Sequence, residues 1–245
     1  NIEKITNLNS ITLFPAVSPD NSILLFSSFF DKWMKLYMYE LNEGKLELLA
    51  GYPGLNGPAS FSPDGRHVAL VLSKDGDADI FVMDIKKRKL ERLTTERSIE
   101  TSPCWSPTGN EIVFTSDRSG SPQIYIMDAD GANVRRISWL QSSYNDQPSW
   151  NPRGDKIAFA SMIREQFDIV VVDVLGENPV VLTSTGNNQN PAWSPDGYHI
   201  VFSSNRDGNY KLYTMSWYGT EIAPITNGED YSPFWSARYN WNFEK

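Results

Sequence analysis

A motif that returns about every 44 residues constrains this chain more than any other feature. In chain order it reads VSPD at 17–20, FSPDG at 61–65, WSPTG at 105–109, WNPRG at 150–154, WSPDG at 193–197 and WSAR at 235–238. The corresponding anchor positions, Ser18, Ser62, Ser106, Asn151, Ser194 and Ser236, are 44, 44, 45, 43 and 42 residues apart. A fixed period of this size is typical of architectures in which each repeat is one supersecondary unit.

Each period contains four short stretches with the composition of β-strands. An apolar run such as VALVLS at 68–73 or IVFTS at 112–116 follows the anchor, and a polar turn such as DRSG at 117–120 follows that run. No stretch of helical periodicity reaches twelve residues. Short β-branched strands separated by Gly, Asp and Asn turns and repeated radially predict an all-β chain. We expect one β-propeller domain over residues 1–245. The Trp or Phe of most anchors is predicted to pack between adjacent blades.

The strand count predicts that one blade is divided between the two ends of the chain. There are six first strands and six fourth strands, but only five clear second and third strands. Residues 1–6 match a fourth strand and residues 233–239 match a first strand. We therefore predict six four-stranded blades, of which the split one is incomplete. From the residues alone, its two middle strands could lie upstream of Asn1 or downstream of Lys245.

The charge balance disfavours two classes of partner. The chain has 22 Lys and Arg against 30 Asp and Glu, which gives a net charge of −8. Nucleic acid and anionic membrane surfaces require clustered positive charge, so neither is expected as a partner. No apolar run approaches the roughly eighteen residues of a membrane-spanning helix, so no membrane insertion is expected. Cys104 is the single cysteine, which excludes an intramolecular disulfide.

Residues suited to catalysis or metal binding form no recognisable pattern. Neither a G-x-S-x-G nucleophile motif nor a Cys-His pair can be read. His67 and His199 both stand five residues after an anchor position, which is a polar position at the start of a strand. Two imidazoles in that position of different blades do not supply the converging histidines of a metal centre. We therefore predict no catalytic residue, no metal site and no cofactor.

The aspartates at 75, 77 and 79 resemble the opening of a calcium loop. Ile80 and Lys86 occupy its sixth and twelfth positions, where an EF-hand needs Gly and a bidentate Glu. An exposed hairpin turn is therefore expected instead.

Two other polar features favour structural roles. The acids Asp84, Asp128 and Asp173 close the third strand in successive blades, and this repetition indicates a hydrogen bond to a neighbouring turn rather than catalysis. Cys104, between Pro103 and Trp105, is predicted to be a small buried filler rather than a reactive thiol.

The loops that join one blade's outer strand to the next blade's inner strand are the best candidates for binding. They end just before Pro15, Pro58, Pro103, Pro148, Pro191 and Pro233, and they differ where the blades repeat. A scaffold leaves such loops free to vary, so the contrast predicts a binding surface at the channel mouth, with ordinary solvated turns as the alternative. The candidate contacts are Asn56, Thr101, Asp146, Gln147, Gln189 and Asn190, with Tyr231 as an aromatic anchor.

The stretch between Gly57 and Trp139 resembles the TolB family of the Tol-Pal cell-envelope system. It contains ASFSPDG, VMDIKKRKLERLT, FTSDRSGSPQIY and RRISW. The resemblance implies a monomeric, non-enzymatic periplasmic propeller of six blades, linked to envelope integrity, cell division and colicin import. In that family an N-terminal α/β domain contacts the partner TolA. Nothing here resembles that domain, so we expect a fragment or shortened relative that begins inside its first blade, with the missing strands upstream.

The resemblance also implies a partner at the channel mouth. TolB receives the peptidoglycan-associated lipoprotein, Pal, there, and the matching contact positions are Leu55, Asn56, Gly57, Pro58, Thr101 and Ser102. Leu55 stands where the family has a histidine and Ser102 where it has a glutamate, so a compensating change in the partner is expected. Two alternatives are a substrate-gating propeller of a prolyl-oligopeptidase or tricorn-like peptidase, and a sugar-binding propeller unrelated to Tol.

Overall fold

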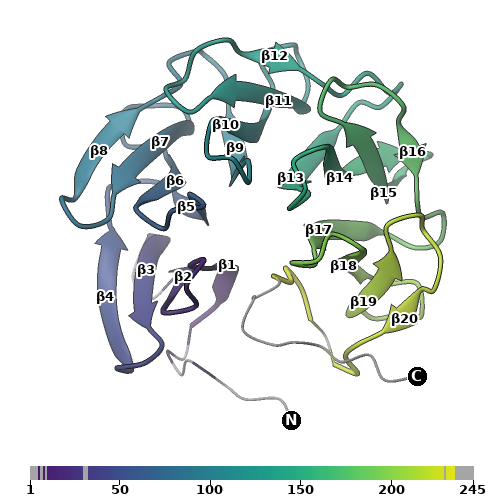
Figure 1. The fold of residues 1–245 in the computed structure, drawn as a ribbon, viewed down its shortest axis with the longest axis horizontal. Coiled ribbons are helices and arrows are strands. Elements are labelled where there is room, and N and C mark those ends of the chain that lie inside the picture. Colours follow the sequence, from purple (N-terminus) through teal and green to yellow (C-terminus); the bar gives the residue numbers. More distant parts are fainter. Residues whose placement is uncertain (1–4, 6–7, 9, 30–32, 229, 235–245) are drawn as a thin grey trace.

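In a computed structural model the chain forms five four-stranded antiparallel sheets arranged around a central channel (Figure 1). The structure describes residues 5, 8, 10–29, 33–228 and 230–234. These residues contain strands and turns but no helix, and hence no helix able to cross a membrane. The predicted all-β class and propeller architecture are confirmed for five blades.

The strands of each blade follow one another in sequence, from the channel outward. Blades 1 and 2 consist of β1 (Thr12–Val17), β2 (Ile23–Ser28), β3 (Lys35–Glu40) and β4 (Lys45–Ala50), then β5 (Asn56–Phe61), β6 (His67–Leu72), β7 (Asp79–Asp84) and β8 (Lys89–Arg92). Blade 3 consists of β9 (Glu100–Trp105), β10 (Glu111–Ser116), β11 (Gln123–Asp128) and β12 (Arg135–Arg136). Blades 4 and 5 consist of β13 (Asn145–Trp150), β14 (Lys156–Ile163), β15 (Gln166–Asp173) and β16 (Val180–Val181), then β17 (Asn188–Trp193), β18 (His199–Ser204), β19 (Lys211–Ser216) and β20 (Ala223–Pro224).

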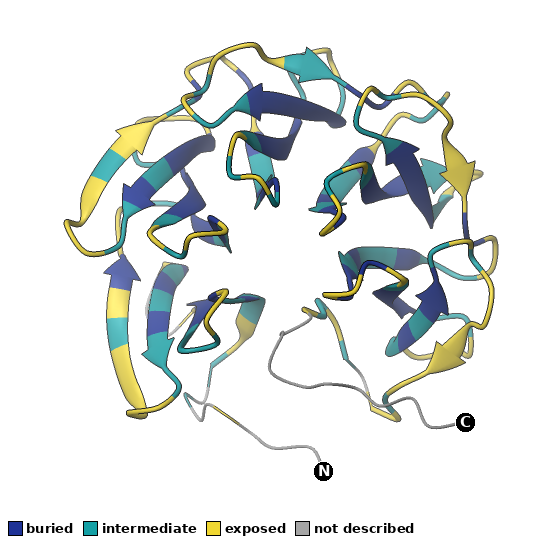
Figure 2. Ribbon diagram, viewed as in Figure 1, coloured by how far each residue is buried: buried dark blue, intermediate teal, exposed yellow. Residues whose placement is uncertain are grey.

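The second strand of each described blade is almost entirely buried, and in blades 2 to 4 a described blade lies on each side. In β6, β10 and β18 every residue after the first is buried (Figure 2). The outermost strands face solvent, and β12, β16 and β20 are only two residues long. This decrease in burial from the second to the outermost strand explains why the second strands are continuous apolar runs in the sequence and do not alternate between apolar and polar residues.

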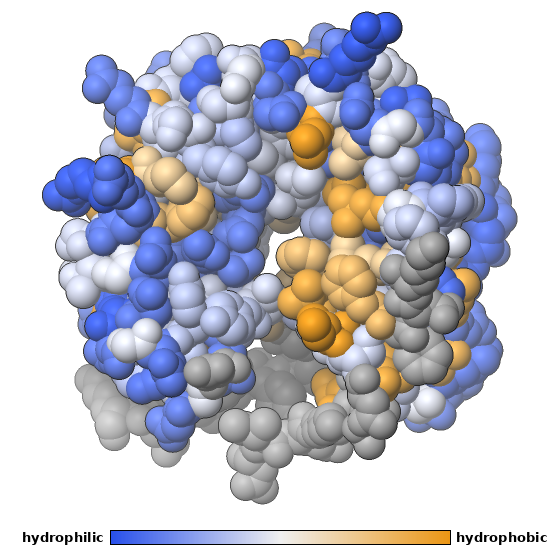
Figure 3. Space-filling model, turned by 180° about the vertical axis from the view of Figure 1, so that it is seen from behind, coloured by the Kyte–Doolittle hydropathy of each residue, from blue (hydrophilic) through white to orange (hydrophobic). Residues whose placement is uncertain are grey.

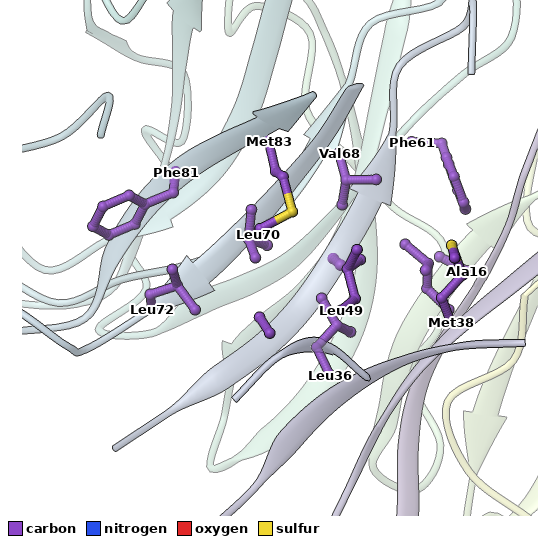
Figure 4. Close-up of a cluster of buried hydrophobic side chains, with 13 residues drawn as sticks. Ala16, Leu36, Met38, Leu49, Phe61, Val68, Leu70, Leu72, Phe81 and Met83 are labelled. Atoms are coloured by element: carbon purple, nitrogen blue, oxygen red, sulfur yellow. The ribbon is translucent and has the colours of Figure 1, made fainter. Parts of the chain in front are cut away.

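Each hydrophobic cluster is shared by two adjacent blades. The cluster between blades 1 and 2 combines Leu36 and Met38 of one with Leu70 and Phe81 of the other (Figure 4). The anchor tryptophans at the next three interfaces, Trp105, Trp150 and Trp193, are at least 91% buried, which confirms their predicted packing role.

The repeated anchor motif closes the turn between the first and second strands. In blade 2 the Ser62 hydroxyl donates to the Asp64 carboxylate at 2.6 Å and accepts the His67 backbone N–H at 3.0 Å. The same two contacts recur at Ser18 and Ser194 in blades 1 and 5. Gly65 adopts a φ of +68°, a left-handed conformation that suits glycine. His67 and His199 begin β6 and β18 and are half-buried, as their position predicts.

Several sequence-based assignments can be compared with the structure. Asp75 and Asp77 lie in an exposed turn as predicted, but Asp79 is fully buried in β7 and pairs with Arg92 at 2.6 Å. The prediction was wrong for Asp79 because the strand begins at that residue, and burial raises the pKa of its carboxyl. Asp84 and Asp173 accept backbone N–H bonds from the turns after their strands, which confirms the structural role.

The sixth blade stays a prediction. Residues 1–4, 6–7 and 235–239, which make up most of its expected first and fourth strands, lie outside the described residues.

The anchor geometry predicts a pH-dependent effect of Ser62→Ala. At pH 7 the substitution should lower the free energy of unfolding by about 1–2 kcal/mol, because the half-buried His67 N–H loses its acceptor. The Ser62 hydrogen bond also lowers the pKa of Asp64 in the folded state. This hydrogen bond therefore stabilises the folded state at neutral pH, and the stabilisation is lost as pH falls through the lowered pKa of Asp64. The deficit of Ser62→Ala should therefore shrink below about pH 4, as urea unfolding would measure. A deficit that grows on acidification would contradict this account.

Candidate binding surface at the channel mouth

The inner strands share a bulge that turns side chains into the channel. The residue before the inner-strand proline has a left-handed φ: +54° at Ser102, +59° at Gln147 and +54° at Asn190. The register with the second strand shifts at the same place in every described blade. A bulge re-aims side chains locally. Its result is a channel cavity of about 160 Å³ lined by Pro15, Pro58, Pro103, Pro148, Pro191 and Pro233.

Cys104 packs against the cluster between blades 3 and 4, as the prediction of a small filler requires, but it is not fully buried and also lines this cavity. Its side chain is only half-buried, because the bulge brings it to the channel wall. The surroundings nevertheless raise the pKa of the thiol through desolvation, and the Trp150 backbone N–H contacts the sulfur at 3.5 Å. A thiol with a raised pKa carries little thiolate and is a poor nucleophile.

Hydrogen bonds between blades link the polar residues predicted at the mouth. Asp146 Oδ1 accepts from the hydroxyls of Ser102 at 3.0 Å and Thr115 at 2.8 Å, both in blade 3. The Gln147 side-chain oxygen accepts the Asn190 backbone N–H of blade 5 at 2.8 Å. Four of the predicted contact residues therefore form a continuous half-buried rim across three blades.

Asn56 occupies a different environment from the one its sequence position suggested. It is 0% exposed, and its amide nitrogen donates to the backbone oxygens of Met34, Tyr52 and Gly54. Its side-chain oxygen accepts the Tyr52 N–H at 2.9 Å. Asn56 therefore holds the β4–β5 loop from inside and presents no group to a partner in this conformation. Asn188 plays the same part in the loop before β17.

The remaining predicted residues divide by exposure. Leu55 and Thr101 are half-buried, and Leu55 packs against the cluster between blades 2 and 3. Gly57 is buried with a φ of +106°, and any side chain there would collide with Ser27. Pro58 faces the channel and Gln189 is half-buried at the rim. Tyr231 is 54% exposed and packs on the Tyr210 ring, with centroids 4.7 Å apart.

Sequence reasoning missed the apolar part of the mouth. Figure 3 shows that face, with apolar surface gathered on one side of the channel and mainly polar surface on the other. Exposed apolar side chains in loops at this end include Ile11 before β1, Phe29 after β2, Tyr52 before β5 and Ile99 before β9. The Phe29 N–H donates to the Ile11 oxygen, so these two loops adjoin. No repeat position predicts this surface, because it arises where loops of different blades meet.

The mouth combines polar and apolar groups. Half-buried amides, hydroxyls and one carboxylate border a shallow channel, beside exposed apolar and aromatic side chains. Among the described residues, no group of three or more His, Cys, Asp or Glu is arranged to hold a metal ion.

Comparison with known families and proteins gives a consistent result. The family described as the TolB beta propeller domain, PD40, matches residues 1–239. The Tol-Pal system protein TolB of Francisella tularensis, subspecies mediasiatica and holarctica, is 37% identical over 71 residues. That segment is 28% of this chain and 16% of the relative's length, so the curated relatives are far longer than the matched part.

Solved structures extend the likeness over almost the whole chain. The crystal structure of TolB from Acinetobacter baumannii superposes with a TM-score of 0.85 at 30% identity. The match covers 94% of this chain and 58% of that one. The structure of a putative TolB from Agrobacterium tumefaciens superposes with a TM-score of 0.80 at 24% identity, and the match covers 91% of this chain and 83% of that one. An oligogalacturonate lyase in complex with manganese shares the fold alone, with a TM-score of 0.66 at 16% identity. The match covers 91% of this chain and 68% of that one.

The buried amide at the mouth leads to a stability prediction. Asn56→Ala should lower the free energy of unfolding by about 2 kcal/mol or more, because it leaves several loop carbonyls and the Tyr52 N–H without partners. Asn42→Ala, in the exposed β3–β4 turn, is the matched control and should change stability by less than about 0.5 kcal/mol. Chemical denaturation monitored by tryptophan fluorescence would measure both. Equal effects of the two variants would refute the role assigned to Asn56.

Proposed function

Because the chain belongs to the TolB beta propeller family, which matches residues 1–239, we propose that it is a non-enzymatic periplasmic interaction propeller of the Tol-Pal system. Its partner in this proposal is a Pal-type peptidoglycan-associated lipoprotein domain, bound at the channel mouth. The proposed contact surface consists of Leu55, Gly57, Pro58, Thr101, Ser102, Asp146, Gln147, Gln189, Asn190 and Tyr231, with Asn56 holding the loop beneath it.

The observation that carries the proposal is the hydrogen-bonded rim. Asp146 and Gln147 connect three blades, so the rim groups are already held in place before a partner arrives. Pre-ordered side chains lose little conformational entropy on binding, which favours affinity. The adjoining apolar side and exposed Tyr231 supply the kind of apolar and aromatic surface that anchors protein interfaces.

We also propose that a sixth blade closes a single propeller domain over residues 1–245. Support comes from Ser232, whose φ of +53° matches the residue before the inner-strand proline in blades 3 to 5. Pro233 and Phe234 line the same channel cavity as the inner strands of the five described blades. A monomer, and contacts with other Tol proteins through a domain outside this chain, are part of the same proposal.

The proposed absence of enzymatic activity rests on the relatives at 30% identity and above, which are TolB proteins. The lyase resemblance lies well below that level and concerns the fold alone. No contact or cavity described above favours the peptidase-gating or the sugar-binding alternative.

The decisive experiment is a calorimetric titration of the chain with the soluble Pal domain from the same genome. We expect one-to-one binding with a Kd of about 10 μM or tighter. An unrelated soluble lipoprotein domain serves as the control for non-specific association. No saturable heat at high micromolar Pal concentrations would refute the proposal.

Substitution of the exposed tyrosine tests the location of the interface. Tyr231→Ala should weaken Pal binding about tenfold or more, since an aromatic anchor contributes on the order of 2 kcal/mol. Tyr198→Ala is the matched control: Tyr198 is 50% exposed and stacks on Arg153, but it lies in the anchor turn of blade 5, at the opposite end of the channel. Equal losses in the two variants would contradict a mouth interface.

A further inference from the structure

A cavity of about 570 Å³ lies between blades 2 and 3, at the end of the channel opposite the mouth. We call it the 2/3 groove. Its apolar lining includes Val82, Leu93, Trp105 and Ala129. Its polar lining carries three carboxylates, those of Asp64, Glu91 and Asp130. The volume falls within the range of small-ligand pockets, and an apolar lining with a few polar groups is typical of them.

The equivalent groove between blades 1 and 2 is bridged by an arginine of this chain. Glu47 stands two residues before Leu49, as Glu91 stands two residues before Leu93. The guanidinium of Arg88, from blade 2, reaches Glu47 at 3.1 Å. Glu47 is therefore paired with a cation of the neighbouring blade, in addition to Lys45 of its own strand.

The groove between blades 3 and 4 is also bridged by a guanidinium. Arg135 occupies the position of Glu91, and its side chain donates to the Val174 backbone oxygen at 2.7 Å and to Glu111 at 3.2 Å. Val174 corresponds to Ala129 of the 2/3 groove, because both directly follow the acid that closes the third strand. Between blades 4 and 5, the Lys156 ammonium lies 5.4 Å from the centroid of the Trp217 ring.

The 2/3 groove has the acidic rim without the cation. Neither Lys nor Arg is among the residues that line it, and His67 is its one basic lining residue. Arg66, 3.9 Å from Asp64, is 78% exposed and does not line the cavity. Asp130 Oδ1 accepts the Ala132 N–H, whereas Glu91 makes no ion pair or side-chain hydrogen bond with the described residues. The 2/3 groove therefore differs from the grooves on either side of it, because its acidic groups are not bridged by a guanidinium of the described residues.

We propose that the 2/3 groove binds an arginine side chain of a partner protein. The aliphatic stem would lie on Leu93 and Trp105, as long cationic side chains do on apolar surface. The guanidinium would reach the Ala129 carbonyl, which corresponds to the Val174 carbonyl that Arg135 reaches. Glu91 and Asp130 would supply the carboxylates in place of Glu111, whose own position is taken here by His67. The guanidinium of arginine is planar and carries five N–H donors, so it fits such a set of acceptors better than the compact ammonium group of lysine does. This surface is separate from the mouth, so the inference is independent of the Pal proposal.

The test is an NMR titration of the ¹⁵N-labelled chain with N-acetyl-arginine methylamide. We expect saturable shifts of the His67 and Asp130 amides and of the Trp105 indole N–H, with a Kd of about 1–10 mM for a single side chain. N-acetyl-citrulline methylamide, which is neutral and nearly isosteric, should cause no saturable shift. Equal shifts with both compounds, or with Ca²⁺ and not the arginine derivative, would overturn the proposal.

Two substitutions locate the site. Glu91→Gln should weaken binding of the arginine derivative about fivefold, whereas Glu177→Gln, an exposed acid in blade 4, should leave it unchanged. Glu91→Arg should abolish binding, because the new side chain can bridge the groove as Arg135 does, and the thermal midpoint should not fall. Unchanged binding in Glu91→Gln, or retained binding in a folded Glu91→Arg, would overturn the proposal.

Discussion

Packing of each described blade against the next is the constraint on which the rest of this structure depends. Residues of the second strands, such as Val68 and Ile112, are 0% exposed because both faces of their sheet are covered. Each hydrophobic cluster takes side chains from two blades, so no blade has a complete core alone. Stability in such an assembly resides largely in the interfaces between repeats. Ring geometry therefore also determines where the loops and grooves lie.

The ring gives the channel mouth its rigidity. Buried amides at Asn56 and Asn188 hold the incoming loops to the inner strands, and the bulge after them turns the next residues toward the channel. Contacts such as Ser102 to Asp146 then join one blade to the next. Polar groups that hydrogen-bond to one another in this way hold a fixed arrangement, so the surface can be specific for its partner without reorganising on binding.

The same position in different blades can have opposite chemistry. One position of the repeat shows this: it stands two residues before the apolar residue that ends the fourth-strand segment, and it is occupied by Glu47, Glu91, Arg135 and Val180. Glu47 is an acid bridged by Arg88, Glu91 is an acid without a bridging cation, Arg135 itself bridges two blades, and Val180 is an exposed apolar residue. Packing positions tolerate little change, because each touches two blades. Groove and loop positions tolerate much more, and binding properties can diverge there while the fold stays constant.

The sequence by itself determined the period, the all-β class, the place of the strands in each blade and the packing role of the anchor tryptophans. These properties are encoded within one repeat, by short-range patterns of apolar residues and turn chemistry. Only the tertiary structure decided that Asp79 and Asn56 are buried, that Cys104 reaches the channel wall and that the groove beside Glu91 is open. Each of these depends on a residue of another strand or another blade, 15 to 46 positions away in the three contacts cited, and hence on contacts that no local pattern records.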